Sequence, residues 1–183
     1  MNAGVTTGDA HRDEGGTPLV KVIVEYLDDG VEKSERLWAK PVGDGLYEIR
    51  STPWFVFGIN WGDTVRCAEL AADEVPRVLS VDCTSGHRTL RVIFSPVSRR
   101  EDGRQEQILA RLNAMSAYYE RYNDRMVAVD VEPPADYDAV FDFLARCTDE
   151  QRLIFEEAWE PNVDGFGPTY EDTQPEPDWL ESD

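Results

Sequence analysis

Long hydrophobic runs are absent from this sequence of 183 residues. Apolar stretches such as residues 54–57 fall far short of the roughly 20 residues that a helix needs to cross a bilayer. The first residues lack the basic start and apolar segment of a secretory signal. We therefore expect a cytoplasmic protein that does not associate with membranes.

Cysteine and the common catalytic motifs are also scarce. The three cysteines, Cys67, Cys83 and Cys147, are odd in number and widely spaced, which excludes a disulfide framework and a zinc knuckle. We expect buried thiols at these positions. The sequence contains no glycine-rich nucleotide loop, no zinc-protease motif and no calcium-binding loop. It therefore predicts neither a metal site nor a cofactor.

Basic residues are few, with 18 Lys and Arg against 37 Asp and Glu, so the formal net charge is -19. A field of this sign argues against nucleic acid and suits a basic protein partner. No Lys or Arg follows Arg152, whereas ten acidic residues do. We expect residues 161–183 to be an acidic tail containing Pro and Gly, residues 1–17 a disordered lead-in, and 18–160 one folded domain.

Hydrophobic residues make up 41% of the sequence, which is enough for a packed core. Short β-prone segments fill the first half, and Asp29-Gly30 is a typical hairpin turn between the first two. The predicted strands lie at 19–26, 35–40, 46–49, 52–58, 60–65, 78–82 and 89–94. This spacing predicts an antiparallel β meander or small barrel.

The second half has a helical period. Apolar residues recur every three or four positions over 104–122, a strand is expected at 126–131, and a second helix begins after Asp136 as its N-cap. Residues 151–159 fit either a third helix or a last strand. The predicted fold class is α+β, with a βαβα(β) unit whose right-handed crossover places both helices on one face of the sheet.

The turn between the strands at 78–82 and 89–94 is the candidate ligand site, because Ser and Gly can present adjacent N–H groups to an anion and its neighbours are cationic. The predicted ligand-binding residues are Ser85, Gly86, His87, Arg88 and Arg91, with Trp61 expected to line a groove. The simpler interpretation is a hairpin turn with solvent-facing charges. The nearby aromatic residues are expected to be mostly core.

Catalysis at this turn is disfavoured. Cys83 with His87, or Ser85 with His87 and Asp82, would be a nucleophile with its base, but catalytic groups are usually assembled from distant parts of a fold. We therefore assign no catalytic residue.

Several short stretches, taken in order, resemble a bacterial family catalogued as domain of unknown function 4265. They are Glu35-x-Leu37-Trp38-Ala39, Gly45-Leu46-Tyr47-Glu48-Ile49, Pro53-Trp54-Phe55-x-x-Gly58, Gly62-Asp63-x-Val65, Ser85-Gly86-His87-x-Thr89-x-Arg91 and Ala128-Val129-Asp130-Val131-x-Pro133. The resemblance spans about 18–159 and implies a compact bacterial cytoplasmic domain. It also implies a strand at 153–155, and it implies no activity.

The first functional hypothesis is a non-enzymatic protein-binding module, of immunity or antitoxin type, that masks a basic partner. The alternative is a small-molecule or phosphate-binding domain, enzymes included, that uses the turn from Ser85 to Arg91. A third is an accessory part of a larger complex that the acidic tail contacts. The sequence does not indicate an oligomeric state.

Overall fold

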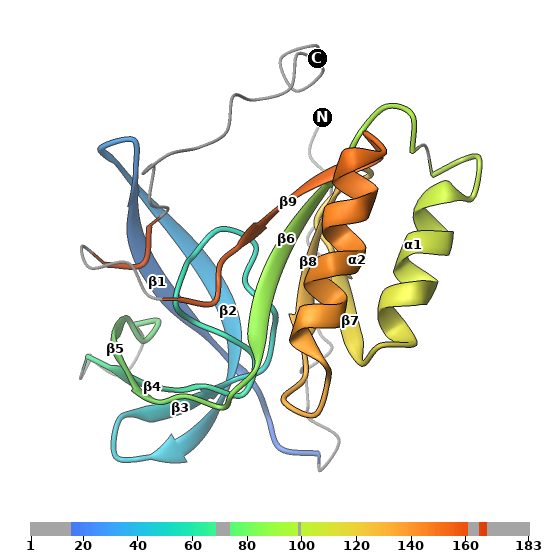
Figure 1. The fold of residues 1–183 in the computed structure, drawn as a ribbon. Helices are drawn as coiled ribbons and strands as arrows, with labels where there is room; N and C mark the ends of the chain where they lie inside the picture. The colour runs from blue at the N-terminus through green and yellow to red at the C-terminus, as the bar shows by residue number, and fades with distance from the viewer. Residues whose placement is uncertain (1–15, 69–73, 99, 161–164, 168–183) are drawn as a thin grey trace.

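The computed structural model describes residues 16–68, 74–98, 100–160 and 165–167, which form two antiparallel sheets and two helices (Figure 1). Most of the predicted lead-in and of the predicted acidic tail therefore lies outside the described residues. Within the tail, Phe166 packs against the core of the first sheet, and its carbonyl oxygen accepts a hydrogen bond of 2.8 Å from the N–H of Phe57.

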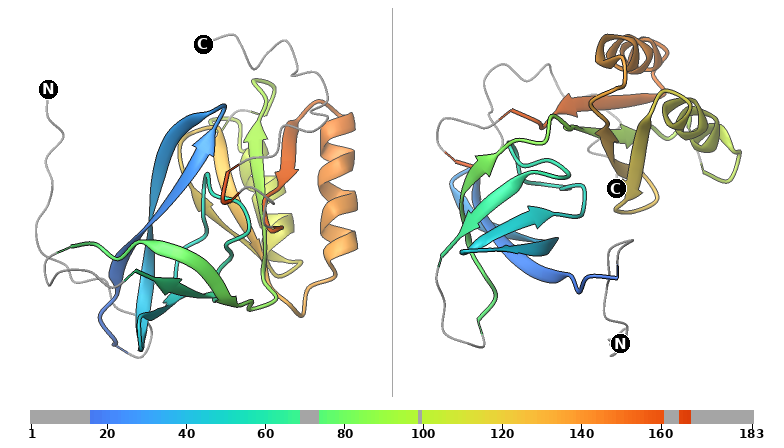
Figure 2. Two further views of the ribbon diagram at one scale, coloured as in Figure 1. Left: turned by 90° about the vertical axis from the view of Figure 1, so that its left-hand side faces the viewer. Right: turned by 90° about the horizontal axis from the view of Figure 1, so that it is seen from below.

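The first sheet is a meander of five strands in sequence order. Its strands are β1 (Val20–Asp28), β2 (Val31–Gly43), β3 (Leu46–Ile49), β4 (Thr64–Cys67) and β5 (Val78–Cys83). The sheet curls until the N–H of Ile23 in β1 bonds the carbonyl of Pro76, just before β5, at 2.8 Å. This confirms the predicted antiparallel meander and gives it the curvature of a small barrel (Figure 2).

The second sheet has the strand order β7-β8-β6-β9, and every pair in it is antiparallel. The elements of this unit are β6 (Arg88–Phe94), α1 (Arg104–Asn113), β7 (Ala117–Arg121), β8 (Met126–Val131), α2 (Tyr137–Asp149) and β9 (Leu153–Glu157). This βαββαβ order is the ferredoxin-like arrangement. Both helices cover one face of the sheet, as predicted, and the first sheet lies towards the other face (Figure 2).

The predicted helix over 104–122 is wrong in its second half. Helix α1 ends at Asn113, Ser116 takes a positive φ of 57°, and β7 follows. Met115 and Tyr119 pack on the same core as Ile108. These apolar residues therefore extend the three-to-four-residue spacing of α1 in the sequence, although they lie beyond the end of the helix. The extra strand also makes β6 and β8 antiparallel, so the βαβ crossover through α1 leads from β6 to β7, which runs parallel to β6 with β8 between them, and not to β8.

The predicted strand at 52–58 is not a strand, and of the one at 60–65 only the last two residues are. Residues 50–63 instead run irregularly between the two sheets and are largely buried. Side chains supply the hydrogen bonds that a sheet would have given. Buried Glu35 accepts the N–H groups of Trp54, Phe55 and Val56 at 2.8 to 3.1 Å.

Other predictions are confirmed. The last strand is β9, and the carboxylate of Asp136 caps α2 by accepting the N–H of Ala139 at 3.1 Å. Cys67 and Cys147 are buried, as expected, but Cys83 is exposed. The expectation of a buried thiol is wrong at Cys83 because this residue is the last of β5, a strand at the edge of the sheet. Within the described ranges, neither α1 nor α2 has the length and apolar character of a membrane-spanning helix.

Candidate functional site

The predicted anion-binding turn is closed by its own hydrogen bonds. The N–H of Ser85 donates to Asp63 at 2.7 Å, and the N–H of His87 donates to the Ser85 hydroxyl at 3.2 Å. That hydroxyl also lies 2.6 Å from the carbonyl oxygen of Trp61, to which it donates. Gly86 takes a φ of 88°, which glycine adopts without strain. The N–H groups of Ser85 and His87 are thus already paired.

A fully buried carboxylate organises this region. Asp63 accepts the N–H of Asn60 at 2.8 Å as well as that of Ser85. The amide side chain of Asn60 in turn accepts the N–H of Thr89 at 2.9 Å and donates to the carbonyl of Trp159 at 3.2 Å. This network joins the irregular segment to β6 and to the residues that follow β9.

His87 is held by a carboxylate from the centre of the second sheet. Its Nδ1 lies 2.9 Å from both oxygens of Asp130, and its side chain is 17% exposed. Burial raises the pKa of Asp130, and the hydrogen bond from His87 acts against that rise. Among the described residues no hydrogen bond engages the other ring nitrogen of His87. An imidazole oriented in this way can donate or accept a proton at that nitrogen.

Arg88 points away from His87 and is stacked between two aromatic rings. Its guanidinium carbon lies 4.4 Å from the ring centre of Tyr137 and 4.5 Å from that of Trp159. Glu157 accepts hydrogen bonds from both of these rings. Burial, reinforced by the bond to Glu157, raises the pKa of Tyr137. The Arg88 charge is therefore used in a packed cation–π contact.

Arg91 lies inside the protein, between the two sheets. It donates to the carbonyl of Val56 at 2.7 Å and to Glu156 at 3.0 Å, and its guanidinium stacks 4.1 Å from the ring centre of Phe57. Burial lowers the pKa of Arg91, while Glu156 opposes that shift. The three predicted cations thus lie in three separate environments, and the contacts of Arg91 are structural. Trp61 is half-buried and faces Arg50, 6.0 Å from its ring centre.

A second exposed feature was not anticipated from the sequence. Tyr118, Glu120 and Tyr122 alternate along the edge strand β7 and its end, so they share the sheet face that points away from the helices. Tyr118 and Tyr122 are 47% and 49% exposed. The ring centre of Tyr122 lies 5.4 Å from that of Trp54 and 5.0 Å from that of Phe55. We call these five residues the tyrosine face.

Glu120, at the middle of the tyrosine face, is half-buried and has a structural role. One carboxylate oxygen accepts the N–H of Thr52 at 2.8 Å and the hydroxyl of Thr52 at 3.1 Å. The carboxylate therefore fixes the irregular segment against β7.

Asp130 and Asp63 were also missed as site residues. Asp130 is the one charged residue of β8, and a charge within an apolar strand is a signal that sequence alone provides. The sequence does not show that its partner is His87, which lies 43 positions away. Among the described residues, no group of three side chains is suited to hold a metal ion.

Comparison with known proteins supports the fold and a family. The family model described as a domain of unknown function (DUF4265) matches residues 35–154. The crystal structure of a hypothetical protein from Neisseria gonorrhoeae is similar with a TM-score of 0.66 and 19% identity, over 78% of this chain and 95% of that chain. At this identity the likeness concerns the fold alone. No curated protein matches the chain.

Proposed function

This chain belongs to the family described as a domain of unknown function (DUF4265), and we propose that it is a non-enzymatic protein-binding module for a basic partner. The observation that carries the proposal is the tyrosine face, where two half-exposed tyrosines flank a carboxylate on an edge strand. An immunity or antitoxin-like factor that masks a basic protein is the specific form of this role.

The tyrosine face has the chemistry of a protein interface. Tyrosine and tryptophan are enriched at the centres of interfaces because each buries a large apolar area and keeps a polar group for hydrogen bonding. Tyr122 is held in place by Trp54 and Phe55, so little side-chain freedom is lost when a partner covers it.

Charge supports a basic partner. The whole chain has a net charge of -19, which steers cationic proteins towards it. Asp130 is the residue paired with Tyr118 across the sheet, and after burial and the opposing effect of His87, the charges of Glu132 and Glu120 raise the pKa of Asp130 further. A cation placed here would relieve that repulsion.

Affinity capture from a lysate of the organism that encodes the chain tests the proposal. We expect the wild type to retain a basic protein at low salt, and to release it as sodium chloride screens the charges. The double variant Tyr118→Ala/Tyr122→Ala should lose this protein. Leu79→Ser, which alters a side chain 62% exposed on the other sheet, is the matched control and should retain it. Equal recovery on both variants would refute the role of the tyrosine face.

A truncation separates the folded surface from the acidic tail. The truncation should remove 168–183 only, because Phe166 contacts the core of the first sheet. Capture that survives this deletion assigns binding to the folded domain, as we expect, whereas loss of capture with an unchanged melting temperature assigns it to the tail.

The alternative, a small-molecule site at the turn from Ser85 to Arg91, is supported by His87, which Asp130 orients with its second ring nitrogen not bonded within the described residues. A ligand bound there should raise the melting temperature. The test is His87→Gln rather than a change at Arg91, whose removal would leave Glu156 and Val56 without their partner. An unchanged melting temperature across a broad metabolite panel would count against this alternative.

A further inference from the structure

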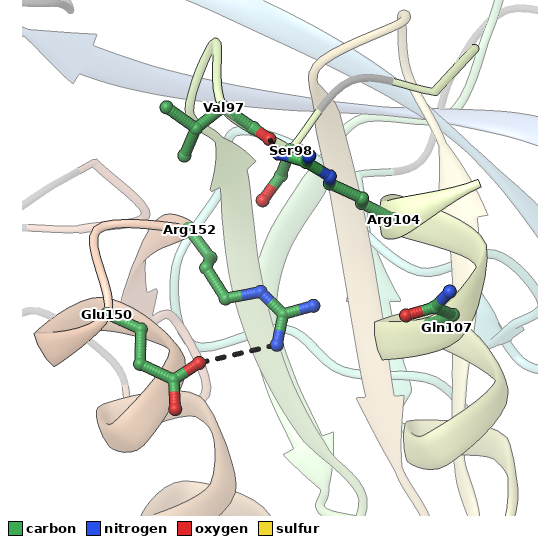
Figure 3. Close-up of a pocket in the computed structure, with 6 residues that line it drawn as sticks. All are labelled: Val97, Ser98, Arg104, Gln107, Glu150 and Arg152. Carbon is green, nitrogen blue, oxygen red and sulfur yellow. Dashed lines mark hydrogen bonds and ion pairs between the residues drawn. The ribbon is translucent and has the colours of Figure 1, made fainter. Parts of the chain in front are cut away.

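A cavity opens at the end of the second unit where β6 leaves the sheet and β9 enters it. Its volume is about 350 Å³, within the range of small-molecule sites. Figure 3 shows the six residues that line it, which we call the arginine cavity: Val97, Ser98, Arg104, Gln107, Glu150 and Arg152. They come from the segment after β6, from the first turns of α1 and from the turn between α2 and β9.

The hydroxyl of Ser98 is a buried polar group without a partner. Ser98 is 1% exposed, and its Oγ makes no hydrogen bond within the described protein. Figure 3 shows this hydroxyl directed towards the space between Arg152 and α1. Burying a hydroxyl without a hydrogen bond costs about 1–3 kcal/mol, so such a group is rarely kept unless something binds it.

Positive charge converges on the same space. Arg104 uses one guanidinium nitrogen to donate to the carbonyl of Val97 at 2.6 Å, and Arg152 uses one to contact Glu150 at 3.4 Å. The remaining N–H groups of both guanidiniums have no hydrogen-bond partner among the described residues. Helix α1 begins at Arg104, and no side chain caps it, so the positive end of its dipole adds to the field.

We propose that the arginine cavity binds a phosphate-type oxyanion, with Arg104, Arg152 and the Ser98 hydroxyl as donors. Guanidiniums bind phosphate through paired N–H groups, and a hydroxyl provides a further donor at short range. The cavity is larger than a single phosphate group, so it has room for a small phosphate monoester as well as for free phosphate. This inference is independent of the tyrosine face.

The negative charge of Glu150 should weaken the binding of an anion in the arginine cavity. Its carboxylate contacts Arg152 and is 61% exposed. A bound phosphate would compete with it for that guanidinium. Glu150→Gln should therefore strengthen phosphate binding, while Arg152→Gln should weaken it.

Nuclear magnetic resonance titration of the full chain tests the site. The probes are sodium phosphate and glycerol 1-phosphate, with sodium chloride added to hold the ionic strength at about 0.15 M, where long-range repulsion is screened. We expect saturable shifts of amides in residues 97–98, 103–107 and 150–152. Tighter binding of glycerol 1-phosphate identifies a monoester as the ligand, and equal affinity identifies free phosphate.

Variants decide whether the cavity is responsible. Arg152→Gln should weaken binding about tenfold or more, since a charge-assisted hydrogen bond is lost. Ser98→Ala should weaken binding without lowering the melting temperature of the phosphate-free protein. Arg111→Gln, at the other end of α1, removes the same charge and should leave the affinity unchanged.

Three results would overturn the proposal. The first is shifts that sodium chloride alone reproduces. The second is equal phosphate affinity in Arg152→Gln and Arg111→Gln. The third is saturable shifts confined to the turn from Ser85 to Arg91, which would place the anion at the other candidate site.

Discussion

The pair formed by His87 and Asp130 joins a surface turn to the middle of a sheet. Asp130 of β8 is paired with Thr89 of β6 and is 7% exposed, so its carboxylate depends on the imidazole for solvation. A charge that is buried in this way makes stability depend on pH, because the folded and unfolded chains bind protons differently.

The pH dependence has a definite sign. Burial raises the pKa of Asp130 above 3.8, so its protonated form adds stability that is complete below that pH and is lost as pH rises through the raised pKa. Asp130→Asn cannot titrate. The free energy of unfolding of the variant minus that of the wild type should therefore increase as pH rises from about 4 to 6, by at most about 1.4 kcal/mol per pH unit.

Urea denaturation at several pH values measures this difference. Asp124→Asn, which changes a carboxylate whose side chain is 86% exposed, is the control and should show a nearly constant difference. A difference for Asp130→Asn that stays constant, or that moves towards the wild type as pH rises, would contradict the assignment.

The three cysteines should differ in reactivity. Cys83 is exposed, whereas burial raises the pKa of Cys67 to about 11 and also raises that of Cys147. The thiolate is the reactive form, so a rise of Cys67 from 9.0 lowers its thiolate fraction about 100-fold near pH 8. Mass spectrometry after brief iodoacetamide treatment should find one labelled site, Cys83. Comparable labelling of Cys67 in the folded protein would contradict its placement.

The junction between α1 and β7 contains one residue with a positive φ, Ser116. Ser116 has a φ of 57°, which costs a residue with a side chain about 1–2 kcal/mol. Ser116→Gly should remove that strain, and after the greater backbone freedom of glycine is subtracted we expect a gain of about 0.5 kcal/mol. Ser34→Gly in the exposed part of β2 is the control and should lose about 0.5–1 kcal/mol. Urea midpoints that fall for both variants would contradict this geometry.

Strands with local signals were predictable from the sequence. The bounds of β8 match the predicted 126–131, because an apolar run followed by two prolines marks its end. The strand β7 was missed because Tyr119 packs on the same core as the apolar residues of α1. Its position in the sequence therefore extends the helical spacing of α1, although the chain reverses direction before β7. Periodicity records which core a residue contacts, and it does not record the path between contacts.

The irregular segment could not be predicted for a different reason. Its hydrogen-bond partners are distant side chains, such as Glu120, which lies 68 positions from Thr52. The aromatic residues of this segment have strong β propensity, but tertiary contacts override propensity when they satisfy the backbone. The same distance explains why the turn from Ser85 to Arg91 was identified while its closure by Asp63 was not.

The two units form one interlocked structure through buried polar contacts. Glu35 of β2 accepts the N–H of Trp54, whereas Arg91 of β6 donates to the carbonyl of Val56, so each sheet holds the segment that packs between them. Loss of either unit would leave these groups buried without partners, which costs free energy in the other. We therefore expect neither half to be stable alone.

A single unfolding transition should follow from this coupling. In the variant Trp159→Phe/Trp179→Phe, the three tryptophans that remain, Trp38, Trp54 and Trp61, report on the first sheet and the irregular segment, whereas the helices α1 and α2 belong to the second unit. Tryptophan fluorescence and circular dichroism at 222 nm should therefore give the same midpoint in urea. Two separate midpoints would contradict the coupling.

The net charge of -19 and the tyrosine face together define the proposed role of the whole molecule. The most direct test is calorimetric titration of the captured basic partner, once purified, against the wild type and Tyr118→Ala/Tyr122→Ala. Loss of a central aromatic contact costs about 2 kcal/mol or more, so binding should be weakened about 30-fold or more in the double variant. An affinity within about twofold of the wild type, in a variant that keeps its melting temperature, would contradict it.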